Sequence, residues 1–134
     1  MSQPIFYRKY VIQPYHQNLM VVVHDDIKKA DLWVTKRFRT KQTEDAEYSS
    51  GLAYQLANQE RGLRQFIICI EPRTGIKAIA HESVHIAMFV LECVGISAMT
   101  DNSEPLTYLV EEIMEMVEKT ITQYEKKQEK DKST

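Results

Sequence analysis

The chain carries the sequence IAHESVHIAM at residues 79–88. His81 and His85 are one helical turn apart, so a helix places both imidazoles on one face, where they can bind the same metal ion. Glu82 falls on the neighbouring flank, close enough to a water at that metal to take its proton without being a ligand. Because neutral imidazole nitrogen suits zinc, the pattern H-E-x-x-H predicts a Zn²⁺ site.

The sequence on both sides of this motif is apolar. Residues 78–80 and 86–91 contain no charged side chain, and a helix that is apolar almost all the way round is expected to be interior. Two imidazoles and a carboxylate inside a protein are costly unless they are paired. A metal ion would satisfy all three groups, and the alternative is a hydrogen-bonded structural pair of histidines.

Length and composition indicate one soluble domain. The chain has 134 residues, of which 43% are apolar and 27% charged, as in ordinary globular proteins. A formal net charge of −2 gives no reason to expect nucleic acid as a partner. The longest uninterrupted apolar run, 86–91, is too short for a bilayer, and the first residues lack the apolar core of a signal peptide. We therefore expect a cytoplasmic protein without membrane contact, with Cys69 and Cys93 as free thiols.

The apolar periodicity predicts an α+β domain in the order strand, strand, helix, strand, strand, helix, helix. The expected strands are 5–12, 19–24, 51–58 and 63–70, and the expected helices are 27–38, 75 or 76 to 94, and 103 or 104 onward. This order favours a small, mainly antiparallel sheet packed on the metal-bearing helix. We expect residues 1–124 to form the single domain and the charged segment 125–134 to be a disordered tail.

A third candidate ligand, the acidic residue Glu104, completes a known pattern. Eighteen residues separate His85 from Glu104, which begins the third predicted helix. This spacing resembles the gluzincin branch of the HExxH zinc metallopeptidases, and the order of elements resembles a minimal zincin. The phrase DNSEPLTY at 101–108 is similar to small phage-encoded zincin-like proteins of uncharacterised role. The resemblance implies that His81, His85 and Glu104 bind Zn²⁺ and that Glu82 is the base and proton shuttle.

The chain departs from the gluzincin pattern at two points. Tyr108 stands where thermolysin-like enzymes have an aspartate, so this position can donate a hydrogen bond but carries no charge. The apolar stripe of the third helix also points roughly away from Glu104, which leaves Glu111 or Glu112 as alternative ligands. Tyr108, and with it Tyr54, is a candidate to stabilise an oxyanion, and the alternative for both is simple packing.

The resemblance implies a zinc metallopeptidase that hydrolyses peptide bonds with a zinc-activated water. Its substrate would be a peptide or protein, held by addition to an open edge strand. The expected location is the cytoplasm, which is the host cytoplasm if this chain is phage-encoded like the small proteins that it resembles. The alternative is a catalytically silent metal-binding or protein-interaction protein that keeps the zincin fold. The sequence does not indicate an oligomeric state.

Overall fold

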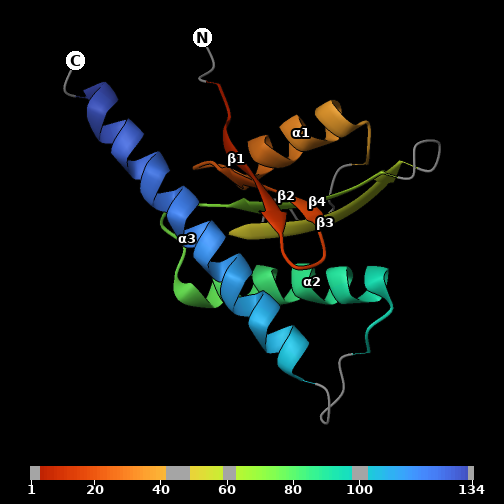
Figure 1. Ribbon diagram of the computed structural model, residues 1–134. Helices are drawn as coiled ribbons and strands as arrows, with labels where there is room; N and C mark the ends of the chain where they lie inside the picture. The colour runs from red at the N-terminus through yellow and green to blue at the C-terminus, as the bar shows by residue number, and fades with distance from the viewer. Residues whose placement is uncertain (1–3, 42–48, 59–62, 98–102, 133–134) are drawn as a thin grey trace.

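The computed structural model describes residues 4–41, 49–58, 63–97 and 103–132. Its elements, in chain order, are β1 (Phe6–Ile12), β2 (Gln17–Val23), α1 (Ile27–Phe38), β3 (Gly51–Asn58), β4 (Leu63–Ile70), α2 (Ile76–Val94) and α3 (Glu104–Lys132) (Figure 1). The predicted α+β class and element order are confirmed. The predicted strands and first two helices agree with the observed bounds to within two residues at each end.

The sheet has four strands in the order β1-β2-β4-β3. The outer pairs, β1 with β2 and β3 with β4, are antiparallel. The central strands β2 and β4 are parallel, with Val21 opposite Ile68. The sheet is therefore mixed, because two hairpins join side by side through their inner strands.

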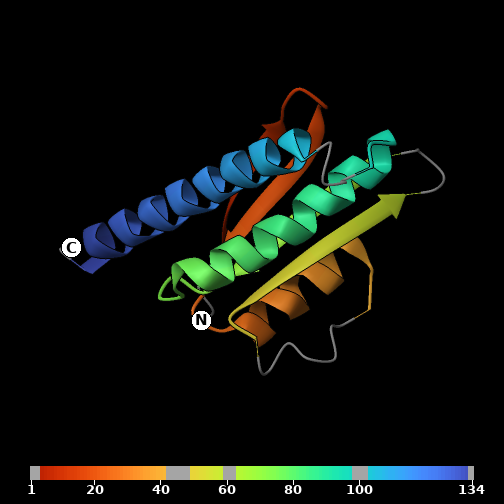
Figure 2. The same ribbon diagram turned by 90° about the horizontal axis from the view of Figure 1, so that it is seen from below.

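Helices cover both faces of the sheet. α1 lies on one face, and α2 and α3 lie together on the other (Figures 1 and 2). Along β2, Leu19, Val21 and Val23 pack toward α2 and α3, whereas Met20 and Val22 pack toward α1. Burial on both faces explains why residues 19–23 of this strand form a continuous apolar run rather than an alternating one.

The predicted apolar stripe of α3 forms the outer wall of the larger core. Leu109, Ile113 and Val117 are fully buried in the core cluster that also contains the inward face of α2. Burying an aliphatic side chain of this size contributes about 1.5–3 kcal/mol. These three residues therefore fix α3 against α2 and the sheet.

The C-terminal segment differs from its prediction. α3 continues to Lys132, so residues 125–132 are helical and not a disordered tail. The segment consists of glutamate, lysine, glutamine and aspartate, most of which favour helix. Tyr124 packs edge-to-face on Phe6 with ring centroids 5.6 Å apart, and Lys127 lies 5.7 Å from the same ring. Contacts to β1 therefore stabilise this helical segment, whose charged sequence alone had indicated a disordered tail.

Both cysteines are free thiols, as predicted, with Cys69 buried and Cys93 half-buried. In the described part of the chain, no helix combines the length and the apolar character needed to cross a bilayer.

Candidate metal centre

The helix that carries the motif is bounded by two glycines. Gly75 is its N-cap, and Gly95 ends it in the left-handed conformation with φ 75°, a conformation that glycine adopts without strain. The N–H of Gly95 donates to the carbonyl oxygens of Glu92 and Leu91. α2 buries one side against the sheet and α3, and leaves the opposite side in solvent.

His81 and His85 lie on this solvent side of α2. Both are exposed, and the side chain of His81 is 67% accessible. Their Nε2 atoms are 3.2 Å apart, and their rings meet edge-to-face with centroids 4.7 Å apart. The common face predicted from the spacing is confirmed. The expectation of an interior helix is wrong for the histidines, because Val84 and Met88 are also exposed and the apolar run does not bury its whole circumference.

The separation of the two nitrogens fits a shared ion. Two imidazoles bound tetrahedrally to one zinc at about 2.0–2.1 Å place their nitrogens about 3.3 Å apart. The observed 3.2 Å between the Nε2 atoms of His81 and His85 agrees with that value. It also agrees with a hydrogen bond in which one Nε2–H donates to the other Nε2. The helix thus presents two preset ligands, or a hydrogen-bonded pair.

Glu82 lies on the neighbouring flank of α2, against the edge strand β3. It is only 7% exposed, yet its Oε1 is 3.7 Å from Nε2 of His81. Burial raises the pKa of this carboxyl, and positive charge on His81 or His85 opposes that rise. A buried carboxyl with a raised pKa beside two imidazoles is suited to accepting and returning a proton.

A glycine makes room for this carboxyl side chain. β3 runs beside α2 in the same direction (Figure 2), and a Cβ at Gly51 would lie 2.9 Å from Cγ of Glu82 and 2.9 Å from Cδ1 of Ile70. Farther along, Nε2 of Gln55 donates to Sγ of Cys93 at 3.2 Å. The edge strand β3 is therefore in close contact with the residue predicted to be the base.

The third predicted ligand is placed elsewhere. Glu104 is exposed at the start of α3, which begins beside the C-terminal half of α2 (Figure 2). Glu111 is exposed and Glu112 half-buried on the same helix. Among the described residues, no group of three or more His, Cys, Asp or Glu side chains is placed to hold a metal ion. The structure thus brings His81 and His85 together without Glu104, Glu111 or Glu112.

The two tyrosine candidates occupy different environments. Tyr108 is 49% exposed on α3. Tyr54 is buried on the α1 face of the sheet, where its hydroxyl donates to Oδ1 of Asp31 at 2.5 Å and lies 4.0 Å from Sγ of Cys69. Burial raises the pKa of the Tyr54 hydroxyl above its usual range. Tyr54 therefore packs across the sheet from α2 and cannot serve an oxyanion there.

Sequence reasoning missed this buried cluster of Asp31, Tyr54 and Cys69. One signal was present, since Asp31 follows Ile27 by four residues and precedes Val34 by three, which puts it on the buried stripe of α1. An aspartate at such a position needs a buried donor, and the Tyr54 hydroxyl provides one.

Comparisons with known proteins give no relative: no family model matches the chain, and neither the curated proteins nor the solved structures contain a significant match. The candidate metal centre therefore has to be judged on its own geometry.

Proposed function

We propose that this chain is a zinc-dependent metallopeptidase of the zincin type, with His81 and His85 as ligands and Glu82 as proton carrier. The observation that carries the proposal is the convergence of three groups on α2. The two Nε2 atoms lie 3.2 Å apart, and a buried carboxyl oxygen lies 3.7 Å from one of them. A merely structural histidine pair has no need of that carboxyl.

The donor set fits zinc at two of its positions. Both ligands are imidazoles at the separation that a tetrahedral ion requires. A catalytic zinc usually has three protein ligands and an open position; the resemblance implies Glu104 as the third, with Glu111 and Glu112 as alternatives, but the described residues form no three-ligand group with the histidine pair. Bound zinc would lower the pKa of a water and polarise a substrate carbonyl.

The chain's own residues would then move the proton. Glu82 is held in place by burial beneath Gly51, and its raised pKa favours taking a proton from the attacking water. The same carboxyl would return this proton to the leaving amine. Because β3 is an edge strand in contact with Glu82, an extended peptide added to β3 would bring its backbone close to this group.

One observation favours a second candidate function, a metal-binding protein without catalysis. Both histidines are exposed, and the described residues supply no third ligand near them. Such a protein would bind zinc through His81 and His85 and would hydrolyse nothing.

Glu82→Gln separates the two candidate functions. Zinc content, measured by elemental analysis after dialysis, should be unchanged in this variant, while hydrolysis of a mixed peptide library should fall by about 10²-fold or more, the scale of a lost general base. The ligand variant His81→Ala should lose both zinc and activity. His16→Asn is the matched control, since His16 has φ 53°, a backbone conformation that asparagine tolerates.

Zinc binding and peptide cleavage by the wild-type protein together distinguish the candidate functions. A wild-type protein that binds zinc but cleaves no peptide would contradict the peptidase and leave the silent metal-binding protein. A protein that binds no zinc would contradict both and leave the hydrogen-bonded histidine pair.

A further inference from the structure

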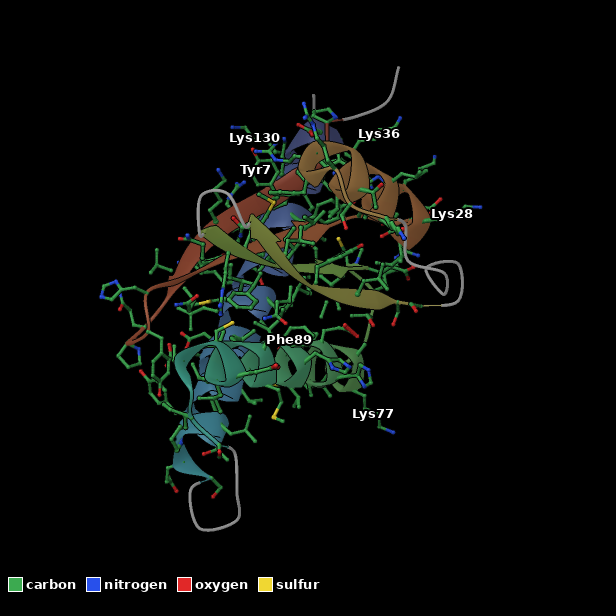
Figure 3. All side chains as sticks on the ribbon, turned by 90° about the vertical axis from the view of Figure 1, so that its right-hand side faces the viewer. Tyr7, Lys28, Lys36, Lys77, Phe89 and Lys130 are labelled. Carbon is green, nitrogen blue, oxygen red and sulfur yellow. The ribbon has the colours of Figure 1, made fainter. Side chains whose placement is uncertain are left out.

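The exposed side of α2 extends well beyond the two histidines. We define the α2 outer face as Lys77, His81, Val84, His85, Met88 and Glu92, all of them exposed. Val84 and Met88 are 41% and 45% accessible, although such side chains are usually buried. Lys77 points away from the body of the protein at the N-terminal end of the helix (Figure 3). The α2 outer face thus carries two candidate metal ligands next to two apolar side chains, with a cation at its N-terminal end and an anion at its C-terminal end.

This face supplies only half of a closed zinc site. A structural zinc has four protein ligands, whereas the described residues offer His81 and His85 without a third. Ligands on an exposed helix face are accessible to another molecule that carries the same pair. A second copy of this chain has the missing two imidazoles in the same geometry.

We propose that zinc joins two copies of this chain through their α2 outer faces, with the four imidazoles of two His81–His85 pairs around one ion. This inference rests on the metal binding of the proposed function. A two-fold axis makes the contact self-complementary and closes it at two copies. Val84 and Met88 of each copy flank the ion and become buried in the contact.

The charges at the two ends of the face fix the relative direction of the helices. A two-fold axis perpendicular to α2 makes the two helices antiparallel, so Lys77 of one copy approaches Glu92 of the other. A two-fold axis at the midpoint of His81 and His85 places Lys77 of one copy level with residue 89 of the other, three residues or about 4.5 Å along the helix axis from Glu92. A lysine side chain spans that offset. A parallel arrangement would instead oppose like charges at both ends.

The paired form would regulate the proposed hydrolysis. Four protein ligands leave no position for water or substrate on zinc, and the second copy would also cover the approach to Glu82. Activity per chain is therefore expected to fall as the protein concentration rises through the dimer dissociation constant.

Light scattering combined with elemental analysis tests the proposal. Metal-free full-length protein is titrated with zinc chloride, and molar mass and bound zinc are measured on the same fractions. The expected result is a doubled mass with one zinc for every two chains. A monomer with one zinc per chain would overturn the dimer and leave the proposed function intact. A protein that binds no zinc would overturn both.

A charge-reversal cycle tests the antiparallel direction. Lys77→Glu should raise the zinc-dependent dimer dissociation constant at least threefold, and Lys77→Glu with Glu92→Lys should restore it. Both changes suit the helix dipole, since they place an acid in the first turn and a base near the last. Lys29→Glu, an equivalent change in the first turn of α1, is the control and should have no effect. A double variant no more dimeric than Lys77→Glu alone would refute the arrangement.

Discussion

Gly51 is the position at which the contact between the edge strand and the candidate base can be measured. In Gly51→Ala the new Cβ would lie 2.9 Å from Cγ of Glu82 and 2.9 Å from Cδ1 of Ile70. Both distances are at least about 0.6 Å shorter than the optimal carbon–carbon separation, so the neighbours must shift. Overpacking of this kind costs about 1–3 kcal/mol, and replacing glycine returns about 0.4–1 kcal/mol through the unfolded chain. The expected net loss of unfolding free energy is about 1–2 kcal/mol.

Urea denaturation of the metal-free protein measures this loss. Gly75→Ala is the steric control, because nothing lies within 4 Å of a Cβ at that position. Ile70→Val removes the Cδ1 atom that the new methyl group would meet. The loss of unfolding free energy in the double variant with Gly51→Ala should therefore be smaller than the sum of the two single losses by at least about 0.5 kcal/mol. A Gly51→Ala protein as stable as the wild type would refute the close packing of β3 on Glu82.

Three further changes probe the charges and the core. In metal-free Glu82→Gln, the unfolding free energy at pH 7 should exceed that of the wild type. The reason is that burial raises the folded-state pKa of Glu82, so the wild type loses stability as pH rises through that pKa. Chemical denaturation across pH 4–8 should show that the advantage of the variant vanishes at the acid end. Tyr54→Phe removes the hydroxyl that donates to the buried Asp31 carboxyl and should lower the unfolding free energy by about 1–3 kcal/mol. The control is Tyr10→Phe, whose hydroxyl is half-buried against Thr120. An equally small loss in both variants would contradict the prediction. Ile113→Ala should lower the unfolding free energy by about 2–5 kcal/mol because Ile113 is fully buried. Thermal melting checks this against the control Val11→Ala, which changes an exposed position.

Local patterns accounted for the elements of this fold. Asp26 accepts hydrogen bonds from the N–H groups of Lys28 and Lys29 at the start of α1, and Gly95 ends α2; both residue types mark helix ends by their own chemistry. The parallel pairing of β2 with β4 was not predictable in this way. Nothing in either strand distinguishes its partners, because the paired residues, 19–23 and 66–70, are apolar throughout.

The orientation of the candidate site was only partly predictable. The spacing of His81 and His85 sets their common face, whatever surrounds the helix. Which face of α2 meets the sheet depends on β3 and α3. Because Val84 and Met88 are apolar, the sequence predicted that the exposed side would also be interior. The contact of Asp31 with Tyr54 joins a helix to a strand 23 residues away, and it follows from the sheet register rather than from either local sequence.

Anomalous X-ray scattering at the zinc edge, on crystals grown with zinc, tests the central claim most directly. The account predicts a peak on the exposed side of α2, about 2.0–2.1 Å from Nε2 of both His81 and His85. A map without a peak at this position, in crystals that hold zinc elsewhere, would contradict it and show the two imidazoles to be a hydrogen-bonded pair.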